Sequence, residues 1–303
     1  MHQSTNPRII PHAMRLTNTP LKGTIPLVQE TINKPLDRDR LSVLLAVLLL
    51  SNVLFRFIEL PEQVWSLQAL GSPLEIHVTS TWLLIAFMIG FVCTGASLIL
   101  HDHPHLEEHS GRPIYISWIL PVVLTGVSTY LLGLAPSLLA WIGGLILIAI
   151  GIGLAISAEY TAVSPDAPGY PTARLTLNVL AYLLTFILFA IIYQSRTRSL
   201  VTATLTLITA TVLALDLLSV ADVPLHRMLP FAGIAGLIVG ESTWVLNYWQ
   251  ISSWVGGLFL LLIFYVTVNV AHQHLLERLR ASILVEFAIV TIIVLLVILL
   301  RGT

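Results

Sequence analysis

The chain has 303 residues, of which 56% are hydrophobic and only 10% are charged, and its mean hydropathy is +0.89. Soluble globular proteins carry about a quarter charged residues, so this composition excludes a water-soluble fold for most of the chain. The formal net charge is −1, and no basic patch interleaved with aromatic residues occurs, so we expect no nucleic-acid partner.

The N-terminal segment, residues 1–40, is polar and rich in Pro, Thr and Asn, and no apolar core precedes Leu41. We therefore expect no cleaved signal peptide, and we predict a tail that is disordered on its own. A helix needs about 20 apolar residues to cross a hydrocarbon core of about 30 Å. Nine stretches after the tail qualify: about 41–58, 79–100, 114–134, 136–158, 174–194, 199–220, 229–249, 251–273 and 281–300. The predicted fold is an all-α, polytopic integral membrane helix bundle in contact with the lipid bilayer.

Two of the connecting loops carry distinctive residues. The stretch VWSLQAL around Trp65 follows the first span, and because Trp is common at membrane interfaces we predict a short interfacial helix there. The stretch HDHPHLEEH at 101–109 follows the second span and contains four His and three acids. Imidazoles and carboxylates bind transition metals, although no helical pair of fixed spacing occurs here. The candidate metal ligands are His101, His103, His105 and His109.

The basic residues predict how the chain is oriented, because cytoplasmic loops carry an excess of Lys and Arg. A cytoplasmic N-terminus places eleven basic residues inside: Arg8, Arg15, Lys22, Lys34, Arg38, Arg40, Arg112, Arg174, Arg227, Arg278 and Arg280. The opposite side then has four: Arg56, Arg196, Arg198 and Arg301. With nine spans the C-terminus is external, and we expect the protein in the cell (plasma or inner) membrane.

The spans recur in order, which predicts a tandem duplication. Arg174 begins RLT…LLTFILF, 134 residues after Arg40 begins RLS…LLSNVLF. In the same order VTATLTLI repeats VTSTWLLI, GESTWVL repeats GVSTYLL, and WVGGL repeats WIGGL. Each unit has four spans, so the two copies are parallel repeats that enter the membrane from the same side. The predicted domains are the tail at 1–40, a first repeat at 41–158, a second at 174–273 and a C-terminal ninth helix at 281–303.

Most of the recurring residues indicate helix packing. Ala232, Gly236 and Gly240 have four-residue spacing, which places them on one face of the seventh span. Small residues at this spacing let two helix backbones approach closely in lipid, where no hydrophobic force drives them together. We therefore predict a close helix–helix contact along this face.

Polar residues within the spans are concentrated in the second repeat and the ninth span. The candidates for a substrate or proton site are Glu241, Asp216, Glu286, Asn178, Asn247 and Asn269. An ionisable residue deep in a membrane is a functional candidate because its insertion costs about 2.5–3.5 kcal/mol. Glu241 falls near the midplane of its predicted span, where Val127 stands in the first repeat. We expect it to be neutral and hydrogen-bonded between helices, above a cytoplasmic vestibule lined by four of the other candidates: Asn178, Asp216, Asn269 and Glu286.

Three classes of function remain open. The smooth spans and the long tail favour a structural or accessory subunit of a membrane assembly, with protein partners at the tail or the helix bundle. A small-solute or proton-linked transporter would use the polar site in the second repeat. A membrane enzyme acting on lipids or isoprenoids would need the His-rich loop.

Several activities are excluded. The chain contains no motif for nucleotide hydrolysis or α/β-hydrolase chemistry, which favours a protein that is not an enzyme. Its single cysteine, Cys93, excludes an intramolecular disulfide. The only lysines, Lys22 and Lys34, lie in the tail, which excludes a retinal-type Schiff base within the spans. No cofactor follows from the sequence.

Overall fold

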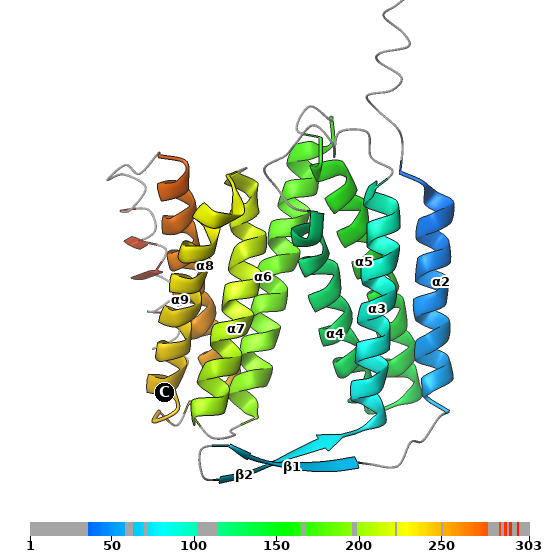
Figure 1. Cartoon of the computed structure of the whole chain (residues 1–303), viewed down its shortest axis with the longest axis horizontal. Coiled ribbons are helices and arrows are strands. Elements are labelled where there is room, and N and C mark those ends of the chain that lie inside the picture. Colours follow the sequence, from blue (N-terminus) through cyan, green and yellow to red (C-terminus); the bar gives the residue numbers. More distant parts are fainter. Residues whose placement is uncertain are drawn as a thin grey trace, which may run out of the picture. The chain divides into compact units, whose positions relative to one another are not determined.

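The computed structural model describes residues 36–57, 63–69, 72–101, 114–164, 168–195, 199–221, 223–249 and 251–277, together with six positions between 285 and 296. Contacts divide the chain between Lys34 and Pro35, and all described residues belong to the second unit. The elements (Figure 1) are α2 Arg38–Phe55, β1 Gln63–Ala69, β2 Ser72–Val78, α3 Ser80–His101, η1 Ile114–Trp118, α4 Ile119–Gly133, α5 Leu138–Ala162, α6 Tyr170–Gln194, α7 Ser199–Leu218, η2 Ser219–Ala221, α8 Leu225–Leu246 and α9 Ser253–Leu275.

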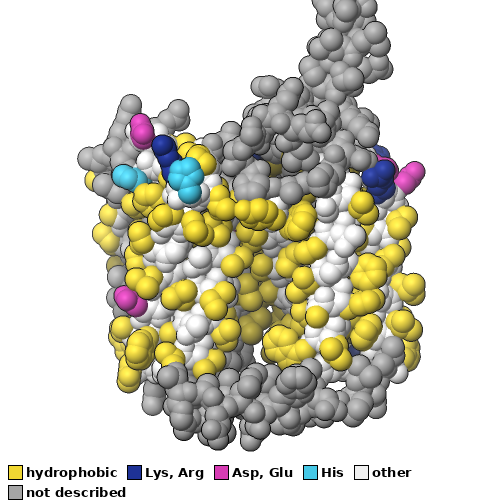
Figure 2. Space-filling view, viewed as in Figure 1, with side chains coloured by type: hydrophobic (Ala, Val, Ile, Leu, Met, Phe, Trp, Pro, Cys, Tyr) yellow, Lys and Arg dark blue, Asp and Glu magenta, His cyan; other side chains and the backbone are white. Residues whose placement is uncertain are grey.

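These helices coincide with the first eight predicted spans. Seven of them, α3 to α9, are long and apolar enough to cross a membrane. The first helix, α2, has 18 residues and begins with the three charged residues Arg38, Asp39 and Arg40. Figure 2 shows that hydrophobic side chains cover the flank of the bundle, and that most charged and His side chains lie near one rim. The prediction of a helical, multi-pass membrane protein is therefore confirmed, whereas the ninth span at 281–300 lies outside the described residues except for isolated positions.

The start of α2 is fixed by a side-chain cap. The carboxylate of Asp37 accepts hydrogen bonds from the backbone N–H groups of Asp39, at 3.1 Å, and Arg40, at 3.3 Å. These bonds satisfy donors that have no partner within the helix, and the Asp37 carboxylate also forms an ion pair with Arg40. The helix therefore begins within the predicted tail of 1–40, and the rest of that tail, residues 1–35, lies outside the described residues.

The segment between α2 and α3 is a β-hairpin, so the predicted interfacial helix around Trp65 is wrong. Strands β1 and β2 pair antiparallel, with Trp65 opposite Ile76 and Leu67 opposite Leu74. The physical reason lies in β2, where Leu74, Ile76 and Val78 alternate with Glu75 and His77, a period of two that suits a strand. Figure 1 shows the hairpin at the end of the bundle where α2 ends and α3 begins, which we call the hairpin end.

The helices pack in two groups. In the first, α2 contacts α3 and α5, α3 contacts α4 and α5, and α4 contacts α5. In the second, α6 contacts α7 and α9, α7 contacts α8 and α9, and α8 contacts α9. The groups meet where α6 contacts α4 and α5 and where α7 contacts α4. One hydrophobic cluster fills the first group, and another fills the second group and extends onto α4 and the end of α5.

The predicted close contact on the glycine face of α8 is confirmed, and its partner is α7. A Cβ atom added at Gly236 would lie 2.6 Å from the carbonyl oxygen of Leu207 and would collide with the Thr211 side chain. A Cβ atom at Gly240 would lie 2.9 Å from the Cβ of Leu207. Only glycine permits this approach, because real Cβ atoms almost never come within 3.0 Å of a neighbour.

Candidate functional site

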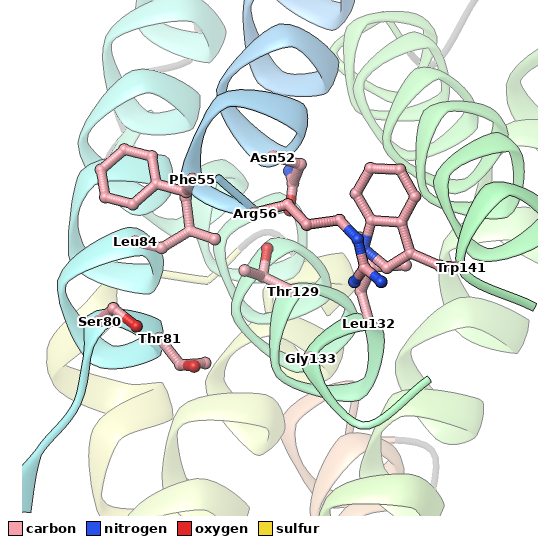
Figure 3. A pocket seen from close by; sticks show the side chains of 10 residues that line it. All are labelled: Asn52, Phe55, Arg56, Ser80, Thr81, Leu84, Thr129, Leu132, Gly133 and Trp141. Atoms are coloured by element: carbon pink, nitrogen blue, oxygen red, sulfur yellow. The ribbon is translucent and has the colours of Figure 1, made fainter. Parts of the chain in front are cut away.

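A polar cavity lies at the hairpin end of the first helix group. It has a volume of about 110 Å³, which is enough for several waters or one compact ligand group. The end of α2, the start of α3, the end of α4 and the start of α5 surround it (Figure 3). Its lining consists of Asn52, Phe55, Arg56, Ser80, Thr81, Leu84, Thr129, Leu132, Gly133 and Trp141.

Arg56 supplies the positive charge among the described residues that line this cavity. It caps the end of α2, and its guanidinium carbon lies 4.9 Å from the centroid of the Trp141 ring. Figure 3 shows its side chain extending from α2 toward Trp141, across the cavity from Ser80 and Thr81. The cation–π contact holds the guanidinium at the cavity wall while its N–H donors remain available to a ligand.

Asn52 lies one helical turn before Arg56, so both side chains project from the same face of α2. It is buried, and its Nδ2 donates to the carbonyl oxygen of Leu48 at 2.9 Å and to the sulfur of Met88 at 3.6 Å. These bonds fix the orientation of the amide. Asn52 therefore presents a pre-set polar group to the cavity beside the guanidinium.

Thr129 differs from its neighbours in the bonding of its hydroxyl. Thr125 donates to the carbonyl oxygen of Pro121 at 2.7 Å, and Ser128 donates to that of Leu124, as is usual for hydroxyls within helices. Thr129 is only 2% exposed, and its Oγ1 has no hydrogen-bond partner among the described residues. Leaving a buried hydroxyl unpaired costs about 1–3 kcal/mol, so a hydrogen bond from this group to a ligand or water would recover that cost.

At the sequence-equivalent positions of the second helix group, apolar side chains stand in place of Asn52 and Arg56. Phe186 occupies the place of Asn52, and its ring centroid lies 5.9 Å from that of Trp254, the equivalent of Trp141, with the two rings tilted. Ala190 occupies the place of Arg56 and packs closely against Gly257. Two further polar groups there are paired within the protein: Asn247, the equivalent of Gly133, donates to Thr202, and Thr243, the equivalent of Thr129, donates to the carbonyl oxygen of Val239. Among the described residues, these equivalent positions therefore carry either apolar side chains or polar groups that are bonded within the protein.

Within the described part of this chain, Glu241 does not lie between helices, contrary to the expectation from the sequence. Its side chain is exposed on the outward face of α8, between the exposed residues Leu237, Ile238 and Val245. The described residues provide no hydrogen bond or ion pair to its carboxylate. The helix α8 spans Leu225–Leu246 rather than the predicted 229–249, so Glu241 lies five residues before its end, about 8 Å from the hairpin end rather than near its middle.

The other described candidates of the second repeat lie on α6, α7, α8 and α9, and the vestibule, whose predicted members include Glu286, stays a prediction. Asn247 ends α8 and its Nδ2 donates to the Thr202 hydroxyl at 2.8 Å. Asn269 donates to the Tyr182 hydroxyl at 2.9 Å and to the Tyr265 carbonyl oxygen at 2.7 Å. These bonds join α8 to α7 and α9 to α6, which is a packing role. Asn178 is half-buried on α6, and Asp216 is buried near the end of α7.

The remaining predicted site residues fall outside what the structure describes. Glu286, His103, His105 and His109 lie outside the described residues, and His101 is the last residue of α3. Within the described ranges, no group of three or more His, Cys, Asp or Glu side chains is placed to hold a metal ion. The metal prediction for the His-rich loop therefore stays a prediction.

Sequence reasoning missed the cavity and a further buried acid. Asn52 and Arg56 are the strongly polar residues of the first predicted repeat, and their four-residue spacing is visible in the sequence. Their pairing with Trp141 and Thr129 depends on three other helices and has no local signal. Glu159 is buried on α5 at 2% exposure, although its position near the end of a predicted span gave it no prominence.

The chain matches one protein-family model. A family model described as "Protein of unknown function (DUF5656)" matches residues 60–301, which covers most of the chain. The chain belongs to this family. The match runs from just before the hairpin through the predicted ninth span, so the cavity residues on α2 precede the matched region and those on α3, α4 and α5 lie within it. No curated protein and no solved structure matches the chain.

Proposed function

We propose that the chain is a non-catalytic, ligand-binding accessory subunit of a membrane assembly, and that its cavity at the hairpin end binds a small anionic group. One observation carries the proposal: the Arg56 guanidinium and the unpartnered Thr129 hydroxyl line the same cavity. Guanidinium matches the geometry of phosphate and carboxylate oxygens, and hydrogen bonds to ionised groups are the strong ones. Among the described residues that line the cavity, none is acidic, so an anion meets no like charge from them.

A phosphate group is the ligand chemistry that the cavity fits best. Arg56 binds two of its oxygens, and the hydroxyls of Thr129, Ser80 and Thr81 donate to the others. The phosphate belongs either to a lipid headgroup or to a free phosphate from solution. Because the cavity opens at the ends of four helices, near the level of lipid headgroups, both sources reach it.

We also propose that the two helix groups are tandem repeats. The contact pattern supports it: the first helix touches the second and fourth, the second touches the third and fourth, and the third touches the fourth, in both groups. The match pairs α2 with α6, α3 with α7, α4 with α8 and α5 with α9, in the order of the repeated sequence motifs. The C-terminal segment at 281–300 is the unpaired ninth helix.

The orientation belongs to the same proposal. With a cytoplasmic N-terminus, the excess of basic residues lies on the cytoplasmic side. The hairpin end, where Arg56 is located, then lies on the external side of the membrane. The cavity then takes its ligand from the outer leaflet or from the external solution. Accessory partners bind through the tail or the helix bundle.

Thr129→Val tests the ligand role of the hydroxyl, with Thr243→Val in the second group as the matched control. In lipid-free detergent without phosphate, Thr129→Val should raise the thermal midpoint, because it removes a buried unpaired hydroxyl. The same variant should bind phosphate more weakly. Thr243→Val removes a hydroxyl that is already bonded to the protein, so it should leave binding unchanged.

The binding measurement separates the two sources of phosphate. Isothermal titration of the delipidated protein with inorganic phosphate reports the free anion, and reconstitution with phosphatidylglycerol or phosphatidylcholine reports the headgroup. Tighter binding of phosphatidylglycerol than of inorganic phosphate identifies a lipid site. If neither phosphate source binds, or if Thr129→Val and Thr243→Val behave alike, the proposal is wrong.

A further inference from the structure

The outward face of α8 is the counterpart of a face that is buried elsewhere in the same chain. On α4, Leu120 and Val127 belong to the hydrophobic cluster of the second helix group, and Leu120 is 0% exposed. Their equivalents on α8, 114 residues later, are Ile234 and Glu241. Ile234 is 51% exposed and Glu241 is also exposed. The α8 face is therefore open at the positions where α4 is covered.

The helix that covers α4 has an open counterpart as well. Leu177 and Leu184 of α6 belong to the cluster that includes the covered α4 residues, and α6 contacts α4. Their equivalents on α2, 134 residues earlier, are Val43 and Leu50. Leu184 is 3% exposed, whereas Leu50 is 68% exposed. Within the chain α4 contacts α6, whereas the equivalent faces of α8 and α2 are both exposed.

We propose that α8 of one copy docks on α2 of a second copy, in the same way that α4 docks on α6 within the chain. The inference rests on the proposed repeat but not on the proposed ligand. Because α4 and α6 run in the same direction, and so do α8 and α2, two copies inserted with the same orientation can form this contact. The contact is head-to-tail, so it leaves an open α2 face and an open α8 face at the ends and extends to rings or arrays.

Glu241 gives the α8 face a reason to be covered. A carboxyl group among apolar side chains is costly when it faces lipid, and the cost falls when helices exclude the lipid around it. Its equivalent in the internal contact is Val127, a residue that fits an apolar interface. Glu241→Val should therefore keep the association, whereas Glu241→Lys should abolish it because a lysine has no acidic partner on α2 at this depth.

The C-terminal segment is the competing occupant of the α8 face. From Arg280 it has Ser282 and Thr291 at the spacing at which α2 has Ser42 and Ser51 after Arg40. This spacing makes it resemble the first helix of a repeat. However, Thr291 lines a cavity with Phe259, Leu262, Ile263, Val266 and Thr267 of α9 rather than with the α8 face. That position favours a second copy on α8.

Cysteine cross-linking in vesicles tests the docking. Cys93→Ala removes the single cysteine, and Ala46→Cys and Leu237→Cys are then introduced into two differently tagged copies, with Val43→Cys and Ile234→Cys, which lie at the same register, as a second pair. Copper phenanthroline oxidation should give a mixed dimer for each pair, since a disulfide requires Cα atoms within about 7 Å. A single copy that carries both cysteines of a pair should give a ladder of oligomers.

Leu147→Cys is the matched control, because Leu147 is 70% exposed on α5 but lies on neither face. It should give no mixed dimer with Leu237→Cys. Three outcomes contradict the proposal: no mixed dimer for either pair, a dimer of Leu237→Cys with itself, or an intramolecular bond from Leu237→Cys to Thr291→Cys in place of the mixed dimer. A failure here with intact phosphate binding rejects the docking and leaves the proposed ligand in place.

Discussion

Replacing Arg56 by Gln should weaken phosphate binding by about 10- to 100-fold, which is the range expected when a hydrogen bond to an ionised group is lost. Arg56 is the only cation among the described residues of the cavity, so none of those residues can take over its charge. Titration calorimetry of the delipidated variant with inorganic phosphate measures the change. The thermal midpoint without phosphate should change little, because the guanidinium is exposed at the end of α2.

Arg56→Lys separates charge from geometry at this position. Lysine keeps the positive charge but cannot offer two parallel N–H donors, and it stacks less well on Trp141. We expect binding intermediate between the wild type and Arg56→Gln. Equal binding by all three proteins would show that Arg56 does not contact the anion.

Replacing Gly236 by Leu should disrupt folding, with a larger effect on stability than any other change considered for this chain. A side chain at this position has to enter the space held by the Leu207 carbonyl and the Thr211 side chain of α7. Overpacking in a close-packed core costs about 1–3 kcal/mol, and here the obstacle is backbone, which cannot rotate away. Thermal scanning and size-exclusion chromatography in detergent should show a lower midpoint and loss of the monodisperse peak.

Gly233→Leu is the control on the same helix. A Cβ atom at Gly233 has no atom within 4 Å, so this substitution removes the same conformational freedom without a collision. It should fold like the wild type. If the two variants are equally stable, then α7 and α8 do not approach as closely as the structure has them.

The sequence predicted the helices well because the signal for a span is length and hydrophobicity. It predicted the glycine face of α8 from four-residue spacing alone. It did not predict which way Glu241 points, because α8 is apolar on nearly all sides and such a helix has no polar face to mark its orientation. The start of α8 was also displaced, since the prediction placed it near 229, after the polar residues His226 and Arg227, and the helix begins at Leu225.

The cavity could be predicted only in part. The spacing of Asn52 and Arg56 placed two polar groups on one face of α2, and this signal was present in the sequence. The rest depends on tertiary contacts: Trp141 is 85 residues beyond Arg56, and the unpaired hydroxyl of Thr129 follows from bonds that its neighbours make. The polar residues of the second repeat drew attention instead, and Asn247 and Asn269 serve helix packing.

A crystal structure grown with selenate tests the anion site most directly, because selenate resembles phosphate in shape and its selenium is located by anomalous scattering. The account predicts an anomalous peak inside the cavity, with selenate oxygens within hydrogen-bond distance of the Arg56 guanidinium and the Thr129 Oγ1. A cavity without such a peak, in crystals that bind selenate elsewhere on the protein, would contradict it.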